Sequence, residues 1–201
     1  MDLIAWINPD LATYDAGGER ASDLVTRLRT DEQLRDDLRQ ADVITFVVPL
    51  GLFVDQCPFD PVAYQPAGTK AQLQACRPQV VSEYKADVHA FFDALVAIRS
   101  PSEALIRVVD NYQSMWQRLH DLGVYEVVRP YWQKTNDAIR AAAAEHGIPV
   151  VHAYDEFNGP DGQIDGVAAR YVDGDQLHLS FEGAERLGQM LVDLGFEPAS
   201  S

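Results

Sequence analysis

The stretch Asp42-Val43-Ile44-Thr45-Phe46-Val47-Val48 decides the fold class of this 201-residue chain. Its β-branched and aromatic residues form a run too short for a typical helix, which predicts a strand. Similar runs at Ala104–Val109 and Pro149–Ala153 predict two further strands, and a weaker run at Leu11–Tyr14 predicts another. The sheet that these strands form depends on what connects them.

Longer stretches with helical spacing of apolar residues lie between and after the strands. They are Ser22–Leu38 (with a break near Thr30-Asp31), Val80–Ile98, Tyr131–Glu145 and Ser180–Leu194. Strands that alternate with helices predict βαβ units and a parallel sheet. We therefore expect a three-layer α/β/α fold, and the length predicts a single domain over residues 1–201.

Residues 52–77 show no helical periodicity and carry three prolines. A segment of this length without regular structure is usually functional, so we predict a long insertion or lid loop. It contains both cysteines of the chain, Cys57 and Cys76. The two could pair and close a loop of about 20 residues. Because pairing depends on the redox state of the compartment, the sequence leaves the bond open.

The net charge of the chain argues against some classes of binding partner. Sixteen basic and 31 acidic residues give a net charge of −15, which argues against nucleic acid and anionic membranes, because both bind clustered Lys and Arg. No apolar run approaches the length of a membrane span, and the N-terminus does not have the pattern of a signal peptide. The chain as written is therefore expected to be cytoplasmic, while the sequence leaves the compartment itself unknown. Histidine and cysteine spacing predicts no metal site, and we expect no cofactor.

The strongest chemical signal lies near the C-terminus. Asp175 stands three residues before His178, just ahead of a predicted helix. From there the carboxylate can turn back to the imidazole Nδ1 and leave Nε2 to accept a proton, as in a general base with its orienting group. Asp-x-x-His is frequent by chance, however, and on its own it also fits a surface turn before a helix.

The surrounding sequence adds context. Asp175–Gly183, followed by an amphipathic C-terminal helix, resembles the last conserved block of the SGNH (GDSL-type) hydrolases. Asp15–Leu24 resembles the second block of that family, a glycine loop between a strand and a helix. Gly18 stands where the family's backbone N–H donates to the oxyanion. Ala41–Val48 and Leu105–Tyr112 resemble two later strands of the same family.

The resemblance implies a flavodoxin-like α/β/α fold and serine-dependent hydrolysis of ester or acetyl bonds. In this chain His178 would be the general base, Asp175 its orienter and the Gly18 N–H an oxyanion donor. The expected substrate is a small-molecule ester or an acylated carbohydrate. The family's first block, a strand ending in Gly-Asp-Ser, has no counterpart before Gly18, so the nucleophile is unknown and the first strand is expected to be missing.

A second departure is internal. By register, Pro49 and Gly51 stand where the family has a glycine and the asparagine that donates to the oxyanion. Together the two departures predict a truncated or degenerate hydrolase with little or no activity. The alternative is a non-catalytic binding or interaction module that keeps the pocket. A missing strand would also expose a sheet edge, which predicts either a homodimer paired through that edge or poor solubility.

Overall fold

The computed structural model describes residues 20–48, 57, 59–60 and 65–196. Within these ranges, three parallel strands form one sheet in the order β1 (Val43–Val47), β4 (Leu105–Val109) and β5 (Val150–Val151). Thr45 pairs with Arg107, and Val109 pairs with Val151, so the carboxyl ends of all three strands meet at one edge. A small antiparallel hairpin joins β2 (Phe59–Asp60) and β3 (Gln65–Pro66).

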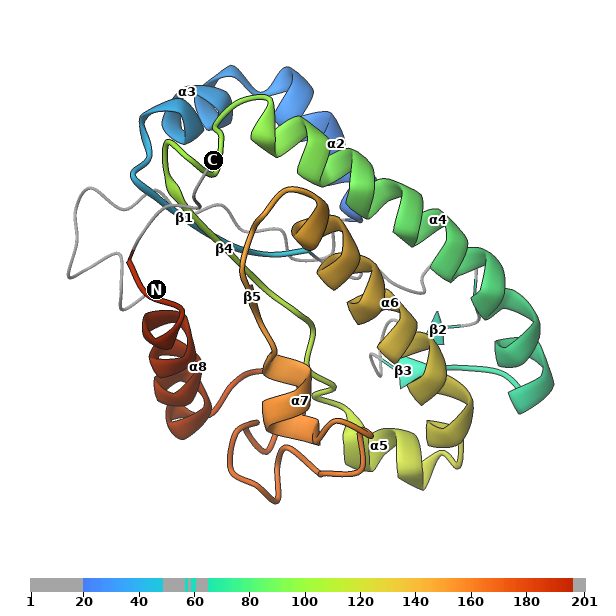
Figure 1. Cartoon of the computed structure of the whole chain (residues 1–201). Helices are drawn as coiled ribbons and strands as arrows, with labels where there is room; N and C mark the ends of the chain where they lie inside the picture. The colour runs from blue at the N-terminus through green and yellow to red at the C-terminus, as the bar shows by residue number, and fades with distance from the viewer. Residues whose placement is uncertain (1–19, 49–56, 58, 61–64, 197–201) are drawn as a thin grey trace.

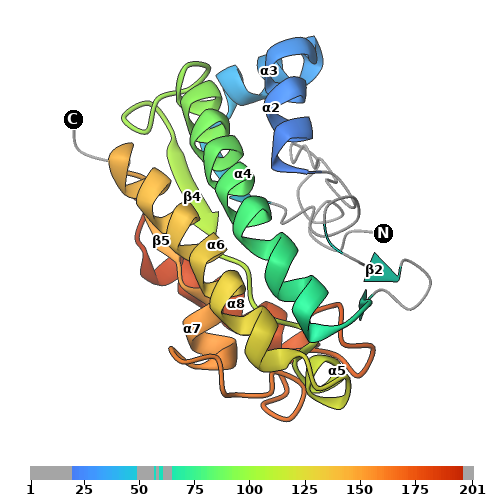
Figure 2. The same cartoon turned by 90° about the vertical axis from the view of Figure 1, so that its right-hand side faces the viewer.

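The helices form the outer layers of the fold (Figures 1 and 2). They are α2 (Ala21–Thr30), α3 (Glu32–Gln40), α4 (Lys70–Val96), α5 (Trp116–Asp121), α6 (Tyr125–Glu145), α7 (Ala153–Asn158) and α8 (Phe181–Asp193). Helices α2, α4 and α6 bury the main core against one face of the sheet, with Ile44 and Val108 at its centre. Helix α8 packs Leu187 and Leu191 against Val109 and Val151 on the opposite face. The predicted parallel α/β/α fold is confirmed.

Local capping explains where several helices begin. Asp31 accepts a hydrogen bond from the Leu34 N–H and starts α3, at the predicted break in the first helical stretch. Ser180 accepts from the Gly183 N–H and starts α8, as its sequence position predicts. Thr69 accepts from the Gln72 N–H and starts α4. These short polar side chains satisfy N–H groups that have no partner within the helix.

Helix α4 begins earlier than its apolar pattern indicates. It starts at Lys70, so the last third of the predicted loop 52–77 is helical, and Cys76 lies on this helix. The helix extends to this point because Leu73 is fully buried, although Pro78 interrupts the sequence pattern. Cys76 is bonded to Cys57, which resolves the open question of the disulfide. The role of the segment as a lid stays a prediction.

Helix α6 also begins earlier than predicted, at Tyr125, because Tyr125 and Val128 are buried in a second cluster. The six-residue helices α5 and α7 have too few turns for a detectable period. The predicted strand Leu11–Tyr14 lies outside the described residues. In the part that is described, no helix is long and apolar enough to cross a bilayer.

Strand β1 lies at one end of the described sheet. The Val43 and Val47 side chains, on one face of this strand, are exposed to 57% and 47%. A strand at the end of a sheet pairs with another chain when its outer backbone N–H and C=O groups are open. Homodimer formation through this edge stays a prediction.

Candidate active site

The predicted base and its orienter lie in contact. Asp175 Oδ2 is 2.6 Å from His178 Nδ1. The other carboxylate oxygen, Oδ1, accepts hydrogen bonds from the backbone N–H groups of Leu177 at 2.8 Å and His178 at 3.1 Å. One carboxylate therefore fixes both the backbone turn and the imidazole ring. The His178 side chain is 80% exposed, which leaves its second nitrogen open to a ligand.

The contact changes the acid–base behaviour of both groups. The hydrogen bond from the His178 ring, together with the two backbone N–H groups, lowers the pKa of Asp175 to about 2. The same hydrogen bond, and the negative charge of Asp175, raise the pKa of His178 above its ordinary value. Asp175 therefore stays ionised, and the imidazole is a stronger base than a free histidine. This is the arrangement of a general base whose tautomer is fixed by a carboxylate.

A short loop, residues 171–180 (hereafter the base loop), carries the pair. An antiparallel bridge between Val172 and Leu179 closes it, and the Ser180 N–H donates to the Tyr171 carbonyl at 3.1 Å. Gly183, in the first turn of α8, lies so close to this loop that a Cβ there would be 1.9 Å from the Tyr171 carbonyl oxygen. Only glycine permits this approach, which fixes the base loop against α8.

The segment that follows β4 holds the base loop from the other side. The Arg118 N–H donates to Gln176 Oε1 at 3.0 Å, and the Tyr112 hydroxyl donates to the Leu177 carbonyl at 3.4 Å. Figure 1 shows the loop between α7 and α8 beside α5. The pair therefore lies near the carboxyl edge of the sheet, where open parallel α/β folds bind their ligands.

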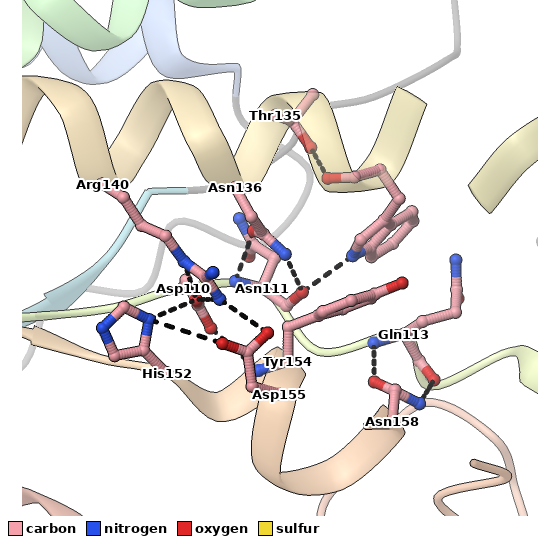
Figure 3. Close-up of polar contacts among 11 residues, drawn as sticks. Asp110, Asn111, Gln113, Thr135, Asn136, Arg140, His152, Tyr154, Asp155 and Asn158 are labelled. Atoms are coloured by element: carbon pink, nitrogen blue, oxygen red, sulfur yellow. Dashed lines mark hydrogen bonds and ion pairs between the residues drawn. The ribbon is translucent and has the colours of Figure 1, made fainter. Parts of the chain in front are cut away.

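A second histidine lies near carboxylates at the same edge (Figure 3). His152 Nδ1 is 3.7 Å from Asp110 Oδ2 and 3.8 Å from Asp155 Oδ2. Arg140 binds both of these carboxylates. Burial raises the pKa of Asp110, while the Tyr154 N–H and Arg140 oppose that rise. The sequence does not predict this cluster, because Asp110 and Arg140 lie far along the chain from His152 and Asp155 and the four residues follow no motif.

The described residues place neither the predicted oxyanion positions nor a nucleophile. Gly18, Pro49 and Gly51 lie outside the described residues, so the oxyanion donor stays a prediction. Ser180 is the N-cap of α8, and Ser22 lies within α2. Among the residues that the structure describes, no serine hydroxyl is hydrogen-bonded to His178, and the nucleophile stays unknown. The same residues contain no group of three or more His, Cys, Asp or Glu side chains placed to hold a metal ion.

Comparison with solved structures identifies the fold. A lipase from a goat rumen metagenome matches with a TM-score of 0.60 and 15% identity, over 89% of this chain and 75% of the lipase. The chain shares the fold of this lipase. A lipase/acylhydrolase from Enterococcus faecalis matches with a TM-score of 0.53 and 14% identity, over 92% of this chain and 75% of the other. No family model and no curated protein matches the sequence. The resemblance predicted from the sequence is thus confirmed at the level of the fold.

Proposed function

We propose that the chain is built for hydrolysis of ester or acetyl bonds, with His178 as general base and Asp175 as its orienter. The observation that carries this proposal is the 2.6 Å contact between His178 Nδ1 and Asp175 Oδ2. The ring is exposed near the carboxyl ends of the strands, in a chain that shares the fold of a solved lipase. The substrate class is a small-molecule ester or an acylated carbohydrate.

The chemistry follows from the two nitrogens of the ring. The Nδ1–H of His178 donates to the Asp175 carboxylate, so Nε2 carries the free electron pair. Nε2 takes the proton of an attacking hydroxyl as its oxygen bonds to the ester carbonyl carbon. The same proton then passes to the leaving alkoxide when the ester C–O bond breaks. Throughout, the negative charge of Asp175 stabilises the imidazolium, and the Gly18 N–H is the proposed donor to the oxyanion.

A second function fits the same chain. The base has no serine partner among the described residues, and Gly51 stands where the resemblance places an oxyanion asparagine. Loss of one such donor costs about 3–4 kcal/mol of transition-state stabilisation where it has been measured. A binding module that keeps the base loop but not the chemistry is therefore the alternative.

The disulfide bears on where the protein acts. Cys57 and Cys76 are bonded and close a loop with a sequence separation of 19. Disulfides persist in oxidising compartments and are rare in the cytosol of most organisms. We therefore propose an oxidising compartment in place of the cytoplasmic location expected from the sequence as written.

Hydrolysis of p-nitrophenyl acetate by the purified chain tests the proposal. His178→Ala is expected to reduce the rate by about 10²–10⁴-fold, the usual contribution of a general base. His89→Ala is the matched control, because His89 lies on α4 and pairs with Glu145, and it is expected to leave the rate unchanged. Activity that survives His178→Ala refutes the mechanism. No activity in the unsubstituted chain, together with binding of the ester, favours the binding module.

A further inference from the structure

Two side-chain amides bind the backbone immediately after β4, where a neighbouring strand would otherwise pair with it (Figure 3). The Asn136 amide accepts from the Asn111 N–H and donates to the Asn111 carbonyl, both at 2.9 Å. The Asn158 amide accepts from the Gln113 N–H at 2.7 Å and donates to the Gln113 carbonyl at 3.0 Å. Each amide offers one acceptor and one donor, as a paired strand residue would.

These two amides are well placed to hold the backbone rigidly. Asn136, Asn158 and Gln113 are each 1% exposed or less. Trp132 Nε1 adds a third hydrogen bond, at 2.7 Å, to the Asn111 carbonyl. The backbone on either side of Tyr112 is therefore fixed by buried hydrogen bonds from α6 and α7, and buried polar groups held in this way are costly to displace.

Tyr112 lies between the two fixed residues. In an extended chain, successive side chains point in opposite directions. The Asn111 side chain reaches the Val48 carbonyl at 3.1 Å, at the end of β1. The Tyr112 side chain instead reaches the base loop, where its hydroxyl donates to the Leu177 carbonyl. The Tyr112 ring packs edge-on against Phe157, with ring centres 5.5 Å apart.

The same aromatic row continues to the start of the base loop. Phe157 stacks on Tyr171, with ring centres 4.7 Å apart. Burial, with a smaller effect of the Asp175 charge, raises the pKa of Tyr112 to about 12. The hydroxyl thus stays protonated and remains a donor at neutral pH.

We propose that Tyr112 is a positioning residue for the base. The Asn136 and Asn158 amides hold the backbone on either side of Tyr112, and its hydroxyl fixes the turn in which Asp175 meets His178. The proposal deepens the proposed function, because it concerns the orientation of the same imidazole. The Leu177 carbonyl and the His178 N–H belong to one planar peptide group, so a shift of this carbonyl also moves the His178 N–H that donates to Asp175.

The test is an NMR titration of the His178 ring protons in Tyr112→Phe, which removes only the hydroxyl. The pKa of His178 is expected to fall toward its ordinary value, to a point between those of the unsubstituted chain and Asp175→Asn. Tyr131→Phe, at a half-buried tyrosine of α6, is the matched control and is expected to leave that pKa unchanged. If the chain hydrolyses esters, kcat in Tyr112→Phe is expected to fall roughly three- to tenfold, the population effect of one hydrogen bond, with KM unchanged.

The outcomes separate this proposal from the one on which it rests. A His178 pKa that is unchanged in Tyr112→Phe but lowered in Asp175→Asn overturns the role of Tyr112 and leaves the base pair intact. A loss of thermal stability without a change in that pKa also overturns it, because it shows a structural role only. If Asp175→Asn itself leaves the His178 pKa unchanged, the proposed function fails. The titration needs no hydrolytic activity.

Discussion

Substitution of Asp110 is expected to destabilise the fold strongly. Its side chain is fully buried at the end of β4. Oδ2 accepts hydrogen bonds from Arg140 Nε, at 2.8 Å, and from Arg140 Nη2, and Oδ1 accepts from the Tyr154 N–H at 2.8 Å. One carboxylate thereby joins β4 to α6 and α7. Asp110→Asn keeps an acceptor for Tyr154 but turns an amide N–H toward the guanidinium of Arg140.

The magnitude follows from what Arg140 retains. Removal of one partner from a buried ion pair costs about 3–5 kcal/mol, because a charge is left without compensation. Arg140 is 26% exposed and keeps Asp155 at 3.1 Å, so we expect the lower end of that range, about 3 kcal/mol. For a chain of this size the loss corresponds to a fall in Tm of about 6–12 °C.

Urea unfolding followed by circular dichroism measures this loss. Asp36→Asn is the matched control, because its ion pair with Arg39 is on the surface and is expected to contribute less than about 1 kcal/mol. Arg140→Met, alone and with Asp110→Asn, completes a double-mutant cycle. The double variant is expected to be more stable than the sum of the single losses predicts, because no charge remains buried alone. Strict additivity, or a loss in Asp110→Asn no larger than in the control, would refute the reasoning.

Three further predictions concern the base loop and the disulfide. Gly183→Ala is expected to lower stability by about 1–3 kcal/mol in thermal unfolding, because its Cβ meets the Tyr171 carbonyl. Gly188→Ala, with open space around it in the same helix, is expected to raise stability by about 0.5–1 kcal/mol. The rate of ester hydrolysis is expected to rise with pH as His178 loses its proton, and the midpoint lies above pH 6.5 because Asp175 raises the pKa of His178. The Asp175→Asn substitution is expected to lower this midpoint. A rate that does not depend on pH contradicts the mechanism. Reduction of the Cys57–Cys76 bond is expected to lower the free energy of unfolding in urea by about 3 kcal/mol. The control is the variant with both Cys57→Ser and Cys76→Ser. If the reductant destabilises this variant as well, the loss does not come from the disulfide.

The features that the sequence predicts well depend on neighbours in the chain. Asp175 and His178 are three residues apart, and Ser180 caps the helix that begins at the next residue. Strands β1 and β4 are mostly apolar and rich in β-branched residues, with Thr45 in one and Arg107 in the other as the polar exceptions. In each case the local pattern contains the groups that interact, so propensity and spacing are sufficient.

The features that the sequence does not predict depend on contacts between distant residues. Asn136 and Asn158 meet their partners across 25 and 45 positions, and Tyr112 meets Leu177 across 65. An asparagine within a helical stretch gives no sign that it will pair with an extended segment elsewhere. The early start of α4 has the same origin, because the burial of Leu73 is decided by tertiary packing.

Burial distinguishes the central carboxylates of the two histidine clusters at the carboxyl edge. Asp110 is fully buried, and its bonds to Arg140 and Tyr154 join three elements, which gives that carboxylate a structural role, although His152 beside it is half exposed. The Asp175–His178 pair is exposed to solvent, where ion pairs contribute little to stability. Yet its carboxylate accepts three hydrogen bonds, and Tyr112 and Arg118 hold its loop in place. The contacts of this exposed pair therefore orient the imidazole ring and contribute little to the free energy of folding. Proton transfer between a side chain and a bound substrate requires such a fixed orientation.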